Sequence, residues 1–291
     1  MNNKEYLVIS RSNGTTRTGS PYASLKVANL TETINVAVWD MPPTAEPQVG
    51  GLVVFYNMKD QDGKKSCDLR DLKALGEPLL DHPLYNLLPR PVRRDVWDDT
   101  IRKLLSYCSD QTLTGIIEEF AARFYEPFCL YPAATSLHHA YPGGLLNHTW
   151  QMLHMLEGLY PCLPCEVKVE HCILAILFHD CGKMSEYSKQ GEPQPDMYLL
   201  GHIYIGAHWL NNILDSKGFD KEETKRIVHC VLAHHGTREF GSPVVPCTQE
   251  AILVNHLDNL SAKTDIWEGT GEMEYMNALG TKKVAPSIHN A

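Results

Sequence analysis

The sequence predicts a multidomain α and β chain, in which a small N-terminal β-barrel is followed by an all-α helical bundle. Two observations predict this order. Short segments rich in β-branched and aromatic residues, separated by turn residues, fill positions 5–75. From Val96 onward, apolar residues recur at spacings of three and four, which is the period of an amphipathic helix. The 291 residues are enough for two modest domains.

The N-terminal segments are predicted to be strands at 6–10, 22–28, 34–39 and 52–58, with a fifth around 66–72. Turn residues separate them, such as Asn13-Gly14, Gly50-Gly51 and Asp62-Gly63. Five short strands within about 70 residues are typical of a small closed barrel, and the OB fold is the best-known barrel of that size. Because OB folds often bind oligonucleotides, this part of the chain is expected to bind nucleic acid.

The rest of the chain is predicted to be helical. After a loop-like stretch, helices are expected from Val96 and then near 143–160, 166–182, 198–216, 220–235 and 248–267. We therefore expect an OB-like domain at 1–76, a linker at 77–95, a helical domain at 96–270 and a loosely held tail at 271–291.

Composition and charge restrict the function. The formal net charge is −9; residues 1–75 hold nine Lys and Arg against eight Asp and Glu, a net +1, which leaves −10 for the rest. This balance argues against a protein that coats nucleic acid by bulk electrostatics. A negatively charged protein can still bind phosphate groups if metal ions supply positive charge at the binding site.

The chain is expected to be cytoplasmic and to have no membrane contact. No apolar run reaches the roughly 20 residues that span a bilayer, and the first residues lack the apolar core of a signal peptide. The nine cysteines are irregularly spaced, which fits a reducing compartment. Cys162 and Cys165 form a C-x-x-C pair that we expect to be a reduced loop pair rather than a zinc site.

Histidines and aspartates recur on or at the ends of the predicted helices. They are His148, His179, Asp180, His202, His234, His235 and Asp258. Several helices could thus each project a ligand into one cleft, as in the metal sites of helical bundles. Imidazole and carboxylate together suit Mn²⁺, Fe or Zn²⁺ better than Ca²⁺ or Mg²⁺. Because no cysteine stands among them, an open catalytic site is favoured over a structural zinc site.

Asp180 adjoins a candidate ligand, so it is the natural residue to bridge two metal ions. Lys183 follows three residues later, which places both on one face of a helical turn. An ammonium at that position is expected to meet a phosphate oxygen.

The order His…His-Asp…His…His…Asp resembles the HD phosphohydrolase superfamily. Longer motifs narrow the resemblance to the YhaM family of 3′–5′ exoribonucleases, which joins an N-terminal OB domain to a C-terminal HD domain. The resemblance covers about residues 5–266. Its motifs are L-H-H-A-Y-P-G-G-L-L-N-H-T (137–149), H-D-C-G-K (179–183), L-L-G-H-I-Y-I-G-A (199–207), A-H-H-G-T-R-E-F-G-S-P-V-V-P (233–246) and L-D-N-L-S-A-K (257–263).

The resemblance implies a divalent-metal-dependent enzyme, typically using Mn²⁺, that removes nucleotides from the 3′ end of single-stranded RNA or, in some members, DNA. Fe, Co, Zn and Mg stay open as alternative metals. It implies a first ion held by His148, His179, Asp180 and Asp258. It also implies a second ion held by His202 and His234 with Asp180 bridging, where His235 takes or shares that role. Lys183 matches the lysine that follows the HD pair.

Further residues are candidates for catalysis or for binding nucleic acid. His139 or His235 could protonate the leaving 3′-oxygen, and we name His139 with Asp180 and Lys183 as catalytic candidates. Candidates for stacking bases or touching phosphates are Tyr22, Trp39, Tyr56, Arg93 and Arg94. Phe55 and Tyr56 alternate along a strand, so at most one of them is expected to be exposed.

Two other functions stay open at this point. One is an HD-type phosphohydrolase or phosphodiesterase that acts on a small nucleotide, although a mononucleotide needs no strand-binding barrel. The other is a catalytically inactive protein that binds nucleic acid, although the ligand set is complete. The sequence also leaves open the preference for RNA or DNA, the substrate length, the native metal and whether the chain forms a homo-oligomer.

Overall fold

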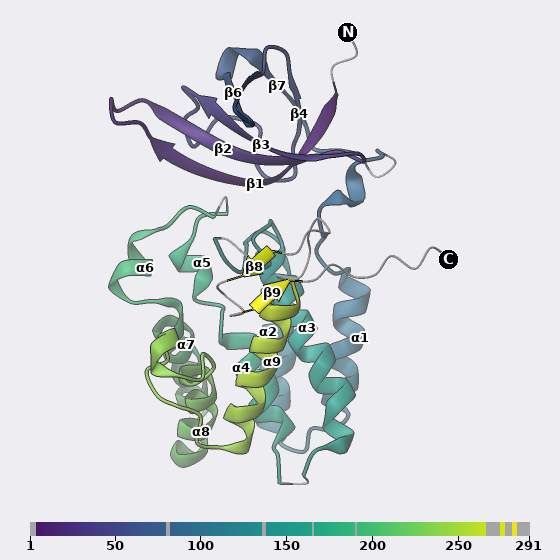
Figure 1. Cartoon of the computed structure of the whole chain (residues 1–291). Coiled ribbons are helices and arrows are strands. Elements are labelled where there is room, and N and C mark those ends of the chain that lie inside the picture. Colours follow the sequence, from purple (N-terminus) through teal and green to yellow (C-terminus); the bar gives the residue numbers. More distant parts are fainter. Residues whose placement is uncertain are drawn as a thin grey trace.

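The computed structural model describes residues 4–79, 82–135, 138–164, 166–189, 191–265, 274–276 and 281–283. Within these ranges, a curled β-sheet formed by the N-terminal part sits on one end of a bundle of helices (Figure 1). The predicted fold class, a barrel-like sheet followed by a helical domain, is therefore confirmed.

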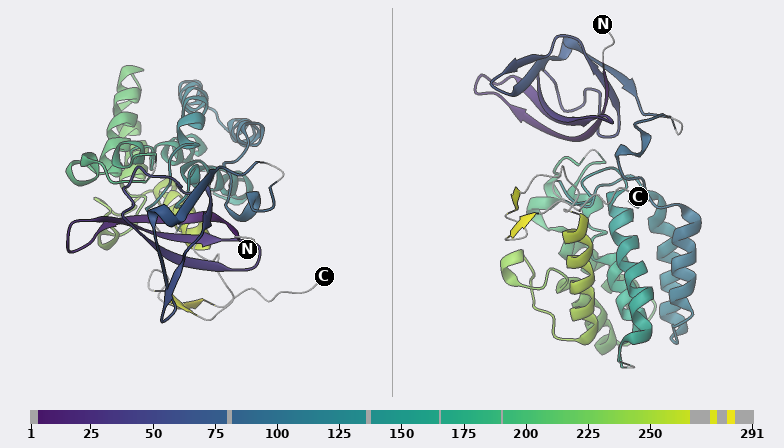
Figure 2. Two further views of the ribbon diagram at one scale, coloured as in Figure 1. Left: turned by 90° about the horizontal axis from the view of Figure 1, so that it is seen from above. Right: turned by 45° about the vertical axis from the view of Figure 1, so that its right-hand side comes forward.

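The sheet has seven strands in the order β5-β6-β3-β2-β1-β4-β7. Neighbouring strands pair antiparallel except β3 and β6, which are parallel. In the described residues β5 and β7 form the two edges, so the curled sheet is a half-barrel and not the predicted closed barrel (Figure 2). The strands are β1 (Glu5–Thr15), β2 (Pro21–Ala28), β3 (Thr33–Trp39), β4 (Leu52–Phe55), β5 (Lys59–Gln61), β6 (Lys64–Asp68) and β7 (Leu72–Gly76).

Two details of the strand prediction are wrong. Asn13-Gly14 is not a turn, because β1 continues to Thr15 and the ring of Tyr22 on β2 covers the space above Gly14. The single strand expected at 66–72 is two strands, β6 and β7, separated by the 3₁₀ turn η1 (Leu69–Asp71). They lie on opposite sides of the sheet order, since β6 pairs with β3 and β7 with β4.

The helical domain contains α1 (Arg94–Leu105), α2 (Gln111–Phe128), α3 (Gly144–Leu159), α4 (Val169–Phe178), α5 (Lys183–Glu186), α6 (Pro195–Leu199), α7 (His202–Ser216), α8 (Lys221–Leu232) and α9 (Gln249–Asp265). Short 3₁₀ turns are η2 (Tyr85–Leu87), η3 (Tyr160–Cys162) and η4 (Arg238–Phe240). Every residue of α4 is buried. A helix that is apolar on all sides belongs in the centre of a domain, and α4 packs against α2, α3, α7, α8 and α9.

Two predicted helices end or begin differently in the structure. The helix expected at 166–182 ends at Phe178, so His179 and Asp180 follow it in a turn. The helix expected at 198–216 is divided into α6 and α7, and α7 begins at His202. Both changes place candidate metal ligands at helix ends, where side chains face a shared space.

The sheet contacts the helical domain through an apolar cluster. Leu7 of β1 and Leu52 of β4 lie on the outer face of the sheet and pack with Leu84, Leu88 and Tyr141. At the tip of β1, the Asn13 amide donates to Glu192 Oε1 over 3.0 Å. The sheet is thus seated on the end of the bundle that contains α5 (Figure 1).

Most of the predicted tail lies outside the described residues, as does Cys165. Within 271–291 the described part is an antiparallel pair, β8 (Glu274–Met276) and β9 (Thr281–Lys283). Among the described helices, none is long and apolar enough to cross a lipid bilayer.

Candidate metal centre

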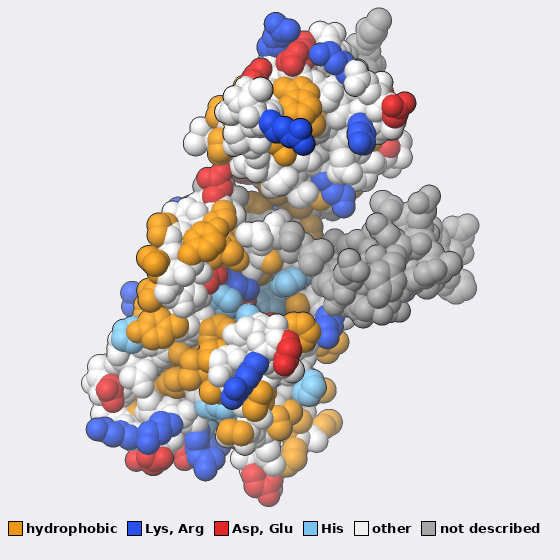
Figure 3. Space-filling model, turned by 60° about the vertical axis from the view of Figure 1, so that its left-hand side comes forward, with side chains coloured by type: hydrophobic (Ala, Val, Ile, Leu, Met, Phe, Trp, Pro, Cys, Tyr) orange, Lys and Arg blue, Asp and Glu red, His pale blue; other side chains and the backbone are white. Residues whose placement is uncertain are grey.

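Six candidate ligands, located in or next to five helices, meet at the end of the bundle beneath the sheet. His148 lies in the second turn of α3 and His202 is the first residue of α7. His179 and Asp180 directly follow α4, His234 follows α8 and Asp258 lies in α9. Helices α3 and α7 begin at this end of the bundle, and α4, α8 and α9 run toward it, which brings these positions together (Figure 1). In the space-filling view, histidine side chains gather there in a hollow below the sheet (Figure 3).

The first group consists of His148, His179, Asp180 and Asp258. His148 Nε2 lies 3.1 Å from His179 Nε2 and 3.1 Å from Asp258 Oδ1. Asp180 Oδ2 lies 3.3 Å from His179 Nε2 and 3.7 Å from His148 Nε2. The ligand atoms of His148, His179 and Asp180 all lie within 4.8 Å of one another, and Asp258 adjoins them through His148. Imidazole nitrogens and carboxylate oxygens gathered in this way are suited to hold a cation.

The second group lies on the other oxygen of the same aspartate. His202 Nε2 is 3.5 Å and His234 Nε2 is 3.9 Å from Asp180 Oδ1. Ligand atoms of His202, His234 and His235 all lie within 4.8 Å of one another. Because Oδ2 faces the first group and Oδ1 the second, Asp180 has the geometry of a bridging carboxylate.

Three buried atoms in this space fit a cation. Asp180 Oδ1, His202 Nε2 and His234 Nε2 have no hydrogen-bond partner among the described residues. A buried polar atom without a partner costs about 1–3 kcal/mol, so native proteins rarely keep three together without a ligand. The donor set of imidazole nitrogen and carboxylate oxygen suits a divalent transition metal.

The other ring nitrogen of each histidine is anchored. His179 Nδ1 lies 2.8 Å from the carbonyl of Ile176, and His234 Nδ1 lies 2.6 Å from that of Val231. A carbonyl only accepts, so each Nδ1 carries the proton and each Nε2 keeps a lone pair for a metal. His202 Nδ1 lies 3.1 Å from both carboxylate oxygens of Glu186, which fixes that ring in the same way.

Lys183 supplies a buried positive charge beside Asp180. Its Nζ donates to Asp180 Oδ2 over 2.7 Å. Burial alone would lower the pKa of this ammonium, but the attraction of Asp180 outweighs it and raises the pKa. Burial likewise opposes ionisation of Asp180, yet the attraction of Lys183 and His179 holds its pKa well below the usual range. Asp180 is therefore ionised and Lys183 protonated at neutral pH.

Burial lowers the pKa of His234 well below its usual value, and His235 and His179 lower it further. Neutral imidazole is the form that binds a metal, so His234 is ready to act as a ligand without losing a proton. His235 Nδ1 lies 2.9 Å from the carbonyl of Phe240, which leaves its Nε2 free to join the second group.

Gly182 allows the second group to form. A Cβ at this position would overlap the backbone of His202, including its carbonyl oxygen. Only glycine therefore lets the start of α7 approach the turn that carries His179 and Asp180. This close approach explains why the H-D-C-G-K motif contains glycine two residues after the aspartate.

His139 is not part of either group. Its side chain is buried, Nε2 lies 3.3 Å from Ser261 Oγ, and Nδ1 lies 3.1 Å from the hydroxyl of Tyr141. Both ring nitrogens thus have protein partners. Its assignment as a catalytic residue stays a prediction.

The candidate nucleic-acid-binding residues lie apart from the metal ligands. Tyr22 and Trp39 pair across β2 and β3, with ring centroids 5.5 Å apart. Tyr56 is half exposed while Phe55 is buried, so only one of the two is exposed, as expected. The reason differs from the expected alternation, because β4 ends at Phe55 and all four of its residues are buried. At the start of α1, Arg93 pairs with Asp95 and Arg94 with Asp98.

The residues that orient the candidate metal ligands by hydrogen bonds were not predicted from the sequence. Glu186 anchors His202 and lies one helical turn after Lys183. Ser261 Oγ lies 2.9 Å from His148 Nδ1 and one turn after Asp258. Each follows a candidate site residue, Lys183 or Asp258, by three residues, which was the available signal, but this spacing does not indicate which histidine it contacts.

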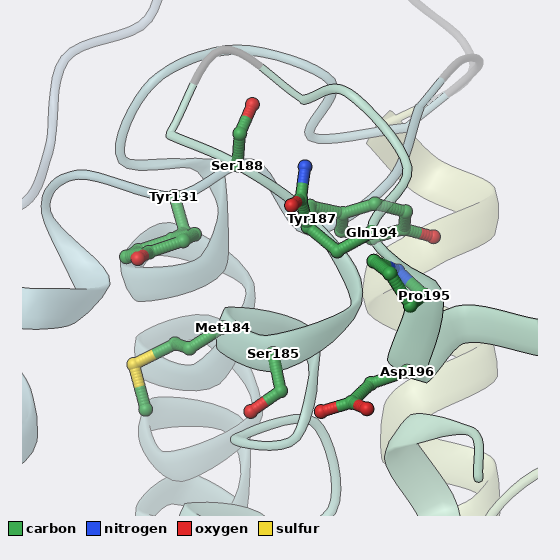
Figure 4. Close-up of a pocket in the computed structure, with 8 residues that line it drawn as sticks. All are labelled: Tyr131, Met184, Ser185, Tyr187, Ser188, Gln194, Pro195 and Asp196. Carbon is green, nitrogen blue, oxygen red and sulfur yellow. The ribbon is translucent and has the colours of Figure 1, made fainter. Parts of the chain in front are cut away.

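A cavity of about 430 Å³ lies beside α5. Figure 4 shows its lining, in which Met184 and Ser185 project from α5, and the side chains of Ser185 and Asp196 approach each other. Lys183 and Glu186 contact metal-ligand candidates instead. Because these pairs occupy different faces of one helix turn, α5 separates the cavity from the metal centre. The full lining is Tyr131, Met184, Ser185, Tyr187, Ser188, Gln194, Pro195 and Asp196.

Comparison with known proteins agrees with this geometry. Residues 145–263 match the family described as HD domain. This range includes all six candidate ligands. No solved structure matches the chain.

Three curated relatives are each named 3′–5′ exoribonuclease YhaM. The protein from Bacillus velezensis is 27% identical over 269 residues, which cover 89% of this chain and 83% of the relative. The protein from Bacillus subtilis is 28% identical over 276 residues, covering 91% and 86%. The protein from a Geobacillus species is 28% identical over 277 residues, covering 90% and 82%. The chain is therefore a homologue of the YhaM-type 3′–5′ exoribonucleases and carries an HD domain.

Proposed function

We propose that this protein is a metal-dependent 3′–5′ exonuclease that hydrolyses single-stranded RNA to nucleoside 5′-monophosphates. The observation that carries the proposal is the pair of ligand groups that share Asp180 and contain three buried ligand atoms without partners. The relatives' name, 3′–5′ exoribonuclease, supports the choice of RNA and the direction of cleavage.

The proposed first site consists of His148, His179, Asp258 and Asp180. The proposed second site consists of His202 and His234 with Asp180, and His235 stands beside it. Two divalent ions in such a site bind the scissile phosphate and lower the pKa of a water that becomes the nucleophile. Mn²⁺ is the proposed ion, and Fe, Co, Zn or Mg are the alternatives.

The protein's own contribution is orientation and charge. Lys183 keeps Asp180 ionised and places a cation where charge develops on the phosphate oxygens. The anchored Nδ1 atoms of His179, His202 and His234 hold the opposite ring nitrogens in fixed positions. No rearrangement of these side chains is then needed during the reaction.

The sheet is proposed to bind the strand upstream of the cleaved bond. Tyr22 and Trp39 form an aromatic pair and Tyr56 is exposed. Each base stacked on such a ring is worth about 1–3 kcal/mol and needs no particular sequence. The division into an OB-like domain at 1–76, a linker at 77–95 and an HD domain at 96–270 belongs to the same proposal.

The test is an assay of single-stranded RNA of about 20 nucleotides, labelled at the 5′ end. We expect Mn²⁺ to produce a ladder that shortens from the 3′ end, and EDTA to stop it until Mn²⁺ is restored. Chromatography should identify nucleoside 5′-monophosphates as the product.

Three outcomes would contradict the proposal. Full activity in EDTA would exclude the metal centre as the catalyst. Internal fragments would indicate an endonuclease. An intact RNA, with phosphate released from a panel of mononucleotides, would assign the chain to the phosphohydrolases of small nucleotides.

A further inference from the structure

We propose that Ser261, His139 and Tyr141 form a hydrogen-bond relay that positions the metal ligand His148 and couples it to the seating of the β-sheet. The inference rests on the proposed metal centre. It gives His139 a positioning role in place of the proton-donating role expected from the sequence.

The relay begins at Ser261, whose side chain is buried. Its hydroxyl donates to Gln151 Oε1 over 2.8 Å. A hydroxyl has one proton, so its lone pairs accept from His148 Nδ1 at 2.9 Å and His139 Nε2 at 3.3 Å. His148 therefore carries its proton on Nδ1, and its Nε2 keeps the lone pair that faces His179 and Asp258.

His139 continues the relay away from the metal centre. Because Nε2 donates to Ser261, Nδ1 accepts from the hydroxyl of Tyr141, which lies 3.1 Å away. The backbone of His139 is held as well, since its N–H donates to Asp265 and its carbonyl accepts from Ala133. The residue has a positive φ of 45°, and its side chain is 0% exposed. A side chain held in this way fixes its neighbours and has no nitrogen left for a substrate.

Tyr141 joins the relay to the sheet and the linker. Its ring packs in the apolar cluster with Leu7 of β1 and Leu52 of β4. Its hydroxyl accepts from Asn147 Nδ2 at 3.2 Å, and Asn147 Oδ1 accepts from the N–H of Val92 at 2.8 Å. A shift of the sheet on the bundle would therefore move Tyr141, and through His139 and Ser261 it would turn the ring of His148.

The first test compares two Tyr→Phe variants of the full chain by calorimetric titration of the metal-stripped protein with Mn²⁺. Tyr141→Phe removes the hydroxyl but keeps the ring in its apolar cluster. We expect Mn²⁺ to bind about tenfold more weakly at one site. Loss of a hydrogen-bond partner of a metal ligand usually lowers metal affinity by about 10- to 100-fold, so this is the lower end of that range. Tyr125→Phe is the matched control, because its hydroxyl donates to the carbonyl of Val92, in the same linker, outside the relay.

The outcomes separate the relay from the metal centre itself. Wild-type affinity in Tyr141→Phe, or an equal loss in Tyr125→Phe, would overturn the relay while leaving the metal centre intact. If the wild type binds no Mn²⁺, the proposed metal centre fails, and the relay fails with it.

A second comparison distinguishes positioning from mere packing. His139→Gln keeps an N–H near the position of Nε2, whereas His139→Leu does not. We expect the glutamine variant to bind Mn²⁺ more tightly than the leucine variant at matched thermal stability. In a Ser261→Ala background, Tyr141→Phe should weaken binding no further, because the relay is already interrupted. Additive losses, or equal affinity of the two His139 variants, would overturn the relay.

The proposed coupling between the sheet and His148 is tested by comparing two neighbouring residues of strand β4. Leu52 belongs to the same apolar cluster as Tyr141, whereas its neighbour Val53 belongs to the core of the sheet. We expect Leu52→Ala to weaken Mn²⁺ binding and Val53→Ala to leave it unchanged. The same affinity in both variants would show that the seating of the sheet does not reach His148.

Discussion

Asp180→Asn is expected to lower kcat/KM for RNA by roughly 10⁴-fold, the scale seen when a central catalytic group is removed. A single carboxylate serves both ligand groups, since Oδ2 faces His179 and Oδ1 faces His202. Asparagine keeps the shape but loses the charge, so both groups lose their shared ligand. The measurement is a steady-state assay of 3′ shortening, together with the Mn²⁺ content of the purified variant.

The matched control for this prediction is Asp196→Asn. Asp196 lines the cavity on the other face of α5, carries the same carboxylate and is not a member of either ligand group. Its activity should equal that of the wild type. Asp180→Asn protein that is folded by circular dichroism and still turns over RNA within tenfold of wild type would exclude a bridging role.

Gly144→Ala is expected to destabilise the protein by about 2–3 kcal/mol, at the upper end of the usual cost of an overpacked site. A Cβ at Gly144 would overlap the carbonyl oxygen of His139, which is backbone and cannot rotate away. The segment that carries His139 would have to move off the start of α3. Urea unfolding monitored by circular dichroism measures the change in the free energy of unfolding.

Gly158→Ala in the same helix is the control. A Cβ there meets no atom within 4 Å among the described residues. Alanine is a better helix former than glycine, so this variant should gain up to about 1 kcal/mol. If both substitutions changed the free energy of unfolding by the same small amount, the backbone of His139 would not lie in close contact with Gly144.

The sequence predicted which candidate ligands the structure brings together, because the signals were local. His179 and Asp180 follow an apolar run, and Phe178 ends a helix that is buried on all sides. Apolar periodicity also predicted α3 and α8 closely, since their tertiary neighbours agree with their intrinsic preference. The motifs around His148 and His234 then predicted which helix ends would share a cleft.

Other features depend on contacts between distant segments. Strands β6 and β7 are adjacent in sequence, but β6 pairs with β3 and β7 pairs with β4. The residue pattern of one short segment does not indicate which strand it pairs with. Gly14 carries a turn signal, yet the ring of Tyr22 keeps it within β1. The sheet is open because β5 and β7 do not pair within the described residues.

The supporting residues of the site were not predicted for the same reason. Glu186 and Ser261 are ordinary polar residues in the sequence, and only the fold places them against His202 and His148. His139 stood out as part of a motif rich in histidine. The structure gives it partners, Ser261 and Tyr141, that no spacing rule predicts.

The most direct measurement is anomalous diffraction at the manganese edge from crystals grown with Mn²⁺. We expect two peaks with Asp180 between them. One peak should contact His148, His179 and Asp258, and the other should contact His202 and His234. A single peak, or no peak among these six side chains, would contradict the two-metal centre on which the proposed chemistry depends.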